Sequence, residues 1–390
     1  MEIDYINGQK TDKIFGMSKY QMEIQKRLDI KFNIIEYNSM MANFEKRYNS
    51  RQLSEYNGSY LKEAVNIDSV GNSKLKNFLV NSSKNIFQNI DRYRYKLIVN
   101  KQIKKDHIKH LTSQEFAYLL NSIKMNKSIV TCYDLIPWVY ENNHSKIWRS
   151  NMAGLKKADI ILTISEFSRD EIVKYLNYPE ERIHIVSAAV DHNLYQKRRD
   201  KTILSKLNLP LDHKYILYVG SETPRQNLTF LLKAFNKLKK TLPNIKLLKI
   251  GDPQSYGARK QFLNSINDMG LQDDVIFIGY VIEEELPKWY NASDILVYPC
   301  LYAGFGLPPL EAMACGTPVI TSNTSSLPEV VDDAGIMVDP YDVDSFYLNM
   351  YKILTNPKMH ADLMEKGIKR AQSFNWDKSA RETKEAYDAL

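Results

Sequence analysis

The stretch from Tyr298 to Ile320, YPCLYAGFGLPPLEAMACGTPVI, decides the fold of this chain. An apolar run that ends at Pro299 predicts the end of a buried strand, and a glycine-containing loop at 303–306 follows it. Pro308 and Pro309 predict the first turn of a helix, because an N–H missing there would have had no intrahelical partner. The stretch therefore predicts a strand, a glycine loop and a helix in direct succession.

This helix start has the features of an anion site. A glycine loop before a helix leaves unpaired backbone N–H groups and the positive end of the helix dipole at one place, which suits a phosphate. The donors must come from Phe305, Gly306 and Leu307, because the prolines have none. Glu311 lies one turn into the helix, and its side chain is expected to lean back toward the loop. Gly316 predicts the helix end. An acid beside a phosphate suggests that sugar hydroxyls bind there too.

The motif resembles the signature of the family-4 retaining glycosyltransferases, also called glycosyltransferase group 1. The resemblance implies an α/β fold with two Rossmann-like domains facing across a cleft, the GT-B architecture. The family carries a glutamate, seven residues and a second glutamate. Glu311 matches the second, and Ala303 stands where the first is expected. The resemblance implies that the first acid lies against the transferred sugar and that the second holds the ribose. The alternatives left open are an ordinary βα turn and, for Ala303, either natural divergence or a deliberate substitution.

Length and composition are those of an ordinary globular protein. A chain of 390 residues predicts two domains, and 44% hydrophobic with 25% charged residues argues against disorder. Cys132, Cys300 and Cys315 lie in apolar contexts without CxxC spacing, so we expect buried, reduced thiols and neither a disulfide nor a metal site. No apolar run reaches the ~18 residues of a membrane span, and the first residues do not resemble a signal peptide. We therefore expect a cytoplasmic location.

Positive charge is concentrated in the segment 92–110, which has seven Lys or Arg against one acid, Asp106. The seven are Arg92, Arg94, Lys96, Lys101, Lys104, Lys105 and Lys109. One interpretation is a peripheral contact with anionic lipid at the inner face of a membrane, which suits a lipid-linked acceptor. The other is a solvated strand edge and loop. Nucleic acid is not expected as a partner, because no recognition motif accompanies the charge.

The first part of the chain alternates strand-like and helix-like segments, as in open α/β sheets. We expect strands at 32–37, at 95–100 and at 128–132, whereas the long polar stretch 38–91 gives no clear periodicity. Gly16 before Ser18, a potential N-cap, predicts another loop-to-helix site. The resemblance places this loop on the acceptor side, with Gly16, Ser18 and Tyr20 as candidate contacts.

A polar pair follows the third of these strands. The family usually has His-Asp at this place, with the histidine beside the transferred sugar. Tyr133 occupies the histidine position and Asp134 the aspartate position. Ser165 is an N-cap candidate after a further strand. The charged stretch 195–212 contains a proline and reads as the interdomain linker. We expect residues 1–198, completed by a terminal helix at 375–390, to form the acceptor-side domain, and 199–374 to form the nucleotide-sugar domain.

The second domain begins with a strand that ends at Gly220, before a loop and an amphipathic helix. The resemblance implies that this loop binds the donor diphosphate through basic residues. Only Arg225 is basic here, since Ser221 and Gln226 occupy positions where many members have Arg and Lys. The resemblance also places the nucleobase after a later strand, near Val281. It covers nearly the whole chain, weakly before residue 130 and specifically after 215.

The sequence thus predicts a glycosyltransferase that moves a sugar from a UDP- or GDP-linked donor to a saccharide or lipid-linked saccharide, with retention of configuration. No cofactor or metal is expected, because backbone N–H groups and a basic side chain can neutralise the leaving diphosphate. The altered positions 133, 221, 226 and 303 keep a second hypothesis open: an impaired transferase that serves as a binding or stabilising subunit. An epimerase or phosphorylase is disfavoured, because no further acids and no pyridoxal-phosphate site are evident.

Overall fold

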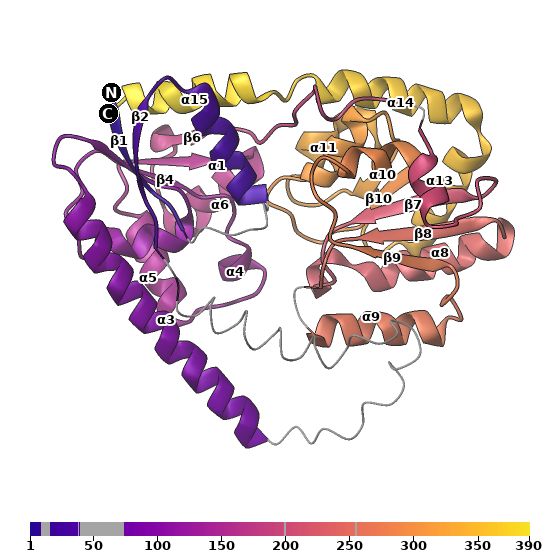
Figure 1. Cartoon of the computed structure of the whole chain (residues 1–390), viewed down its shortest axis with the longest axis horizontal. Helices are drawn as coiled ribbons and strands as arrows, with labels where there is room; N and C mark the ends of the chain where they lie inside the picture. The colour runs from indigo at the N-terminus through magenta and orange to yellow at the C-terminus, as the bar shows by residue number, and fades with distance from the viewer. Residues whose placement is uncertain (9–15, 38, 40–73, 199, 254–255) are drawn as a thin grey trace. The chain divides into compact units, whose positions relative to one another are not determined.

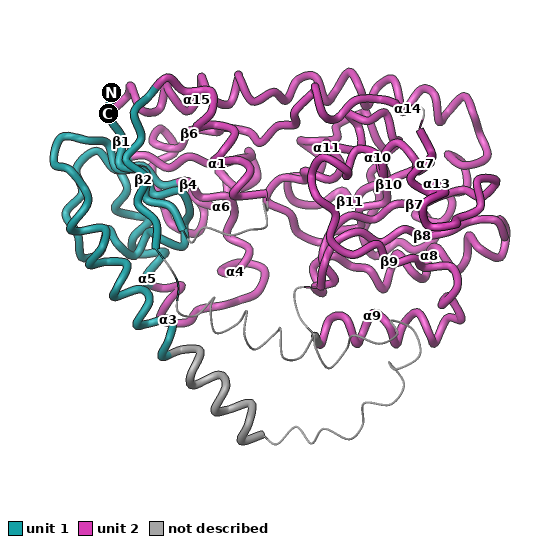
Figure 2. The backbone as a smooth tube through the Cα atoms, in the orientation of Figure 1, with its two compact units in different colours: residues 1–13, 30–130, 150–159 teal, residues 14–29, 131–149, 160–390 magenta. Residues whose placement is uncertain are grey.

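A computed structural model describes residues 1–8, 16–37, 39, 74–198, 200–253 and 256–390, with backbone alone for 74–85 and 256. The chain separates into two compact units (Figure 2). The first comprises 1–13, 30–130 and 150–159, and the second comprises 14–29, 131–149 and 160–390. The predicted boundary between residues 198 and 199 stays a prediction. Most of the polar stretch 38–91 lies outside the described residues.

Two parallel six-stranded sheets form the framework, which confirms the predicted α/β class. The first sheet has the order β2-β1-β3-β4-β5-β6. Its strands are β1 Glu2–Ile6, β2 Lys31–Ile35, β3 Ile108–Leu111, β4 Ser128–Thr131, β5 Ile160–Thr163 and β6 Ile183–Ile185. Strands β3, β4 and β5 are buried at every position. Parallel strands covered by helices on both faces are apolar runs without alternation, which is why β4 was recognisable at 128–132, whereas β3, with its lysine and histidine, was not predicted.

The helices of the first part of the chain connect these strands and cover them. They are α1 Gly16–Arg27, α3 Lys74–Gln102, the 3₁₀ helix η1 Gln114–Asn121, α4 Ile136–Val139, α5 Lys146–Leu155, α6 Glu166–Leu176 and the 3₁₀ helix η2 Glu180–Arg182. The last helix of the chain, α15 Trp376–Asp388, packs against α1. Within the described residues, no helix is both long enough and apolar enough to cross a membrane.

The predicted strand at 95–100 is wrong, because these residues belong to the long helix α3 (Figure 1). Tyr93, Tyr95 and Leu97 alternate with charged residues, which imitates the two-residue period of a strand. In the helix, Tyr95 and Val99 are one turn apart and both are buried, whereas Tyr93 and Leu97 are exposed. The helical period therefore fits the burial better than the alternation does.

The second sheet has the order β12-β11-β10-β7-β8-β9. Its strands are β7 Lys214–Val219, β8 Ile245–Ile250, β9 Val275–Gly279, β10 Ile295–Tyr298, β11 Val319–Ser322 and β12 Ile336–Val338. The accompanying helices are α7 Thr202–Lys206, η3 Pro224–Gln226, α8 Leu228–Thr241, α9 Tyr256–Asp268, α10 Leu286–Ala292, α11 Leu307–Ala314, α12 Leu327–Val331, η4 Asp332–Ala334, α13 Val343–Thr355 and α14 Pro357–Ala371. Helices lie on both faces of this sheet (Figure 1).

The strand order of the second sheet locates a ligand site. The order reverses between β7 and β10, which are neighbours although three α-helices, the 3₁₀ helix η3 and two strands separate them in sequence. In open parallel sheets, ligands bind outside the carboxyl ends of the strands at such a switch point. The loops that meet there are 220–227, after β7, and 299–306, after β10. Both had been singled out by their glycines.

Candidate functional site

The two loops at the switch point are bonded to each other. The amide of Leu301 donates to the carbonyl of Arg225 at 2.8 Å, and the Arg225 guanidinium donates to the carbonyl of Tyr302 at 2.8 Å. Burial raises the pKa of the Cys300 thiol, which lies 3.6 Å from the same guanidinium. Cys132, Cys300 and Cys315 are all buried and unpaired, as predicted. Arg225 is thus fixed where the loops meet.

The start of α11 presents three successive amides. Within the described part of the chain, the N–H groups of Phe305, Gly306 and Leu307 donate to no protein acceptor. Gly306 has φ of 129°, and a Cβ there would lie 2.9 Å from Leu327, so the turn requires glycine. Ser326 Oγ bonds the carbonyl of Phe305 at 2.6 Å and holds the loop in place. These amides have the arrangement expected of an anion cradle.

The other predicted donor-side residues occupy the same sheet edge. Gly220 has φ of 153°, and its amide donates to Ile250 at 3.0 Å. Ser221 is buried, and its carbonyl accepts from the Tyr218 hydroxyl at 2.8 Å. Gln226 is also buried, so its side chain packs inside the protein. Val281 is half-buried just beyond β9. Of positions 221, 225 and 226, Arg225 alone provides a charge.

The loop around Ala303 packs against the Tyr133–Asp134 pair. A Cβ added to Gly304 would lie 2.9 Å from Asp134 Cβ and 2.9 Å from the Tyr133 carbonyl. The amide of Ala303 donates to Ser325 Oγ at 2.9 Å. Burial raises the pKa of Asp134, although its bond from the Ile136 amide and the nearby Arg225 oppose the shift. Tyr133 and Asp134 therefore lie against the loop that contains Ala303, and their roles toward a sugar stay predictions.

The acceptor-side candidates divide into two kinds. Gly16 is exposed, and a Cβ there would lie 3.3 Å from Leu307, which places the start of α1 beside the amides of α11. Ser18 is exposed too. Tyr20 is buried, with its hydroxyl bonded to the Val186 carbonyl at 3.0 Å. The structure thus gives Tyr20 a packing contact, and its role toward an acceptor stays a prediction.

Tyr133 belongs to the same buried layer. Its hydroxyl accepts from Gln21 Nε2 at 2.6 Å, and its ring packs edge-on against Tyr20 with centroids 5.6 Å apart. Burial raises the pKa of Tyr133, so the phenol stays protonated at neutral pH. A neutral phenol can hydrogen-bond a sugar, but it supplies no charge.

Glu311 is surrounded by partners that the sequence did not reveal. Its Oε2 accepts from the Tyr290 hydroxyl at 2.9 Å. Lys19 Nζ lies 3.5 Å from Glu311 Oε1 and 2.5 Å from Glu283 Oε1. Burial raises the pKa of Glu311, and Lys19 opposes this; burial would lower the pKa of Lys19, but Glu311 and Glu283 together raise it. Lys19 is therefore a buried cation that lies between Glu283 and Glu311, the predicted ribose-binding acid.

Two side chains bind the start of α6, and only the first of them was predicted from the sequence. Ser165, correctly predicted as an N-cap, accepts from the Ser168 amide at 3.1 Å and donates to the Gly304 carbonyl at 2.8 Å. The carboxylate of Glu329 accepts from the amides of Glu166 at 2.8 Å and Phe167 at 3.2 Å. An acid from a distant helix thus binds the positive end of α6.

Glu171, also on α6, is a further titratable neighbour of the motif. Its Oε1 accepts from the Tyr302 hydroxyl. Burial raises the pKa of Glu171 to about 7, although that bond opposes the shift. The Glu171 carboxyl group therefore changes its charge near neutral pH, and it contacts Tyr302, the residue before Ala303.

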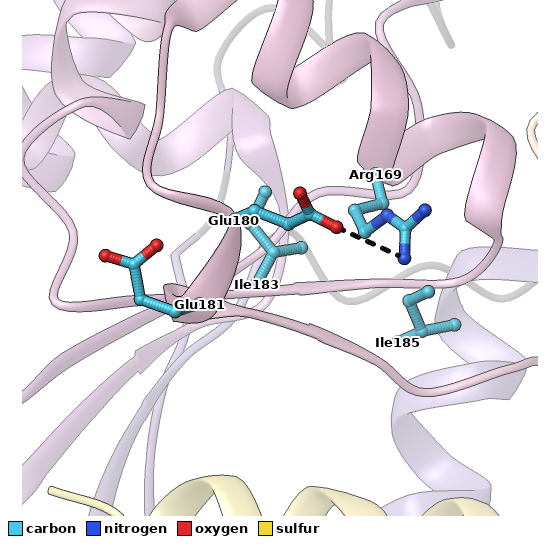
Figure 3. A pocket seen from close by; sticks show the side chains of 5 residues that line it. All are labelled: Arg169, Glu180, Glu181, Ile183 and Ile185. Atoms are coloured by element: carbon cyan, nitrogen blue, oxygen red, sulfur yellow. Dashed lines mark ion pairs between the residues drawn. The ribbon is translucent and has the colours of Figure 1, made fainter.

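A separate hollow lies along the outer edge of the first sheet (Figure 3). It is lined by Arg169, Glu180, Glu181, Ile183 and Ile185, and Arg169 pairs with Glu180 at 3.6 Å. None of the predicted site residues lines it, and two of its five side chains are carboxylates. A hollow with this lining does not suit a diphosphate.

Comparisons with known proteins agree with this geometry. The model of the family described as glycosyl transferases group 1 matches residues 199–370. O-antigen chain mannosyltransferase B of Escherichia coli is 34% identical over 276 residues, which are 68% of this chain and 71% of that protein. The serotype-specific mannosyltransferase WbdA of Escherichia coli is 29% identical over 279 residues, 68% of this chain but 34% of WbdA.

Solved structures show the same fold at low identity. Sucrose-phosphate synthase from Thermosynechococcus elongatus superposes with a TM-score of 0.73 at 20% identity, covering 100% of this chain and 98% of the other. HepE from Anabaena, in complex with UDP and glucose, gives 0.73 at 14% identity, with 100% and 99% covered. With the mannosyltransferase relative and the family match, they confirm that the chain is a glycosyltransferase of the group 1 family with the GT-B fold.

Proposed function

We propose that this glycosyltransferase moves a hexosyl group, mannosyl in the first instance, from a nucleoside-diphospho-sugar to a hydroxyl of a saccharide or lipid-linked saccharide, with retention of configuration. The observation that carries the proposal is the row of three unpaired amides at the start of α11, beside Arg225 at the switch point of the sheet. The mannosyltransferase relatives support the sugar, and HepE, solved with UDP-glucose, supports a nucleotide-linked donor.

The donor diphosphate would lie on the amides of Phe305, Gly306 and Leu307, with Arg225 as its cation. Fixed amides and a guanidinium stabilise the negative charge that develops on the leaving diphosphate, and they need no reorganisation during the reaction. This arrangement would let the enzyme work without a metal. Glu311 would accept hydrogen bonds from the ribose hydroxyls, and the base would lie near Val281.

The transferred sugar would lie beside Ala303, Tyr133 and Asp134. Positive charge grows at the anomeric carbon as the leaving group departs, and a nearby carboxylate stabilises it. Ala303 supplies none. Asp134 packs against the adjacent Gly304 and would supply a carboxylate for this role. The lost acid at 303 is also the observation that favours the second candidate function, an impaired transferase retained as a binding subunit.

Nucleotide binding is the first test. UDP and GDP, each up to millimolar concentration, should raise the melting temperature of the protein through binding to the native state. Arg225→Ala should reduce that rise, whereas Arg169→Ala, which alters the hollow of Figure 3, should leave it unchanged. No rise with either nucleotide would show that the donor-site assignment is wrong. A rise without sugar transfer to any acceptor tested would support the binding-subunit function.

A further inference from the structure

The solvent side of helix α3 carries large apolar side chains in a row. Ile86, Ile90, Tyr93 and Leu97 are 59%, 40%, 63% and 51% exposed. Successive spacings of four, three and four residues put all four on one face of the helix. Single exposed apolar residues are ordinary, but a continuous stripe over three turns marks a surface that binds something.

The opposite side of the same helix accounts for its folding. Tyr95 and Val99 are almost fully buried, and the Tyr95 hydroxyl donates to the carbonyl of Ile35 at 3.2 Å. Asp91 is buried as well and accepts from Ser39 Oγ at 2.7 Å. From residue 86 onward the helix therefore has a packed inner face that is separate from the exposed stripe.

Basic side chains flank the stripe, and no exposed acid interrupts it. Arg94 and Lys101 are exposed on one side of it, and Lys96 lies on the other. Between residues 86 and 102 the sole acid is Asp91, which is buried and lies 3.7 Å from the half-exposed guanidinium of Arg94. The stripe thus has an apolar centre with a positive border, which is the pattern of a helix lying at a membrane interface.

The positive border continues past the end of α3 into a shallow hollow. The hollow is lined by Ile103, Lys104, Lys105, Lys109, Lys124 and Asn126. Lys109 is buried and donates to the carbonyls of Lys105 at 2.9 Å and His107 at 2.5 Å, so its ammonium serves the fold. Lys104, Lys105 and Lys124 are exposed, and the one exposed acid beside them in sequence is Asp106, so the positive charges outnumber the negative charge three to one.

We propose that this α3 surface, formed by Ile86, Ile90, Tyr93 and Leu97 with Arg94, Lys96, Lys101, Lys104 and Lys105, docks on an anionic lipid membrane. The apolar stripe enters the boundary between headgroups and acyl chains, and the lysines and arginines pair with lipid phosphates. The excess of positive charge around an apolar centre fits the anionic headgroups and the apolar interior of such a membrane. The inference stands independently of the donor site.

Sedimentation of the full chain with vesicles tests the proposal. We expect binding to vesicles of phosphatidylglycerol and phosphatidylcholine at low salt, much weaker binding to pure phosphatidylcholine, and a loss of binding as salt is raised. Each basic residue near the surface is expected to contribute about fivefold in affinity. Lys101→Gln with Lys104→Gln should therefore weaken binding by at least ~10-fold. The matched control, Lys358→Gln with Lys369→Gln, removes two exposed lysines from α14 and should have no effect.

Two further variants examine the apolar stripe. Ile90→Ser with Leu97→Ser should also weaken binding by at least ~10-fold, whereas Leu348→Ser, at a similarly exposed site on α13, should not. Leu97→Trp should show a blue-shifted emission with anionic vesicles and quenching by brominated acyl chains, because the indole would enter the boundary region.

Three outcomes would overturn the proposal. The first is folded protein that does not bind anionic vesicles at low salt. The second is binding that neither the lysine pair nor the stripe pair weakens. The third is a dimer in light scattering that the Ile90→Ser/Leu97→Ser variant converts to a monomer without any vesicle binding, which would assign the stripe to a second copy of the chain. Nucleotide-induced stabilisation, measured in parallel, is expected to be unchanged in all these variants, so failure here is separable from failure of the donor site.

Discussion

Replacing Lys19 by methionine would leave two carboxylates facing each other without their shared cation. In the structure, Lys19 Nζ lies 2.5 Å from Glu283 and 3.5 Å from Glu311, and Glu311 also accepts from the Tyr290 hydroxyl. The side chains of Lys19 and Glu311 are 7% and 8% exposed, and that of Glu283 is 23% exposed. Water can therefore reach Glu283 in part but hardly reaches Glu311.

The expected cost follows from that burial. Removing one partner of a buried ion pair costs about 3–5 kcal/mol, because an uncompensated charge stays inside. Methionine replaces the aliphatic stem of Lys19, and Glu283 keeps some hydration, so we expect about 3 kcal/mol, the lower end. Lys26→Met is the matched control on the same helix. Its ion pair with Glu23, at 2.8 Å, is 56% exposed on the lysine side and should contribute at most ~1 kcal/mol.

A double-mutant cycle measures the effect. Stability of the wild type, Lys19→Met, Glu311→Gln and the double variant is compared by denaturant unfolding at pH 7. The double variant should be more stable than Lys19→Met, because glutamine keeps the shape of Glu311 without its charge. The loss in Lys19→Met should also shrink as the pH falls and Glu311 becomes protonated. A Lys19→Met protein within ~0.5 kcal/mol of the wild type, or a double variant no more stable than Lys19→Met, would refute the reasoning.

Three further predictions concern the motif and α6. Ala303→Glu should raise the transfer rate by at least ~10-fold with little change in donor affinity, measured by steady-state kinetics alongside nucleotide binding; equal rates would contradict the role given to this position. Because burial raises the pKa of Glu171 to about 7, above its unfolded value, its contribution to stability is complete below about pH 4.5 and is lost as the pH rises through 7. Glu171→Gln should therefore flatten the decline of melting temperature between pH 5 and 8, and a slope equal to that of the wild type would contradict it. Glu329→Ala should cost about 1–3 kcal/mol and speed hydrogen exchange of the Glu166 and Phe167 amides, since both lose an ionised acceptor; unchanged exchange would exclude the capping role.

The sequence by itself determined the parts whose information is local. The loop at 303–306 and the prolines after it predict a helix start because backbone geometry admits few residues there, and the structure places α11 at Leu307–Ala314. Buried parallel strands were recognisable because both of their faces are apolar. A signature of fixed spacing also singled out Glu311 and Ala303, because both belong to one loop and the helix after it. The Tyr133–Asp134 pair follows β4 of the other sheet, and only the structure places it against Gly304.

Only the tertiary structure decided which distant residues share an environment. Nothing in the sequence distinguishes Lys19 or Glu283 from charged surface residues. The fold places Lys19 within 3.5 Å of both Glu283 and Glu311, which come from separate elements. Tyr93 and Leu97 alternate with charged residues as in a strand, yet packing of Tyr95 and Val99 fixed that segment as a helix. Charge pairing and burial depend on distance in space, which local periodicity does not encode.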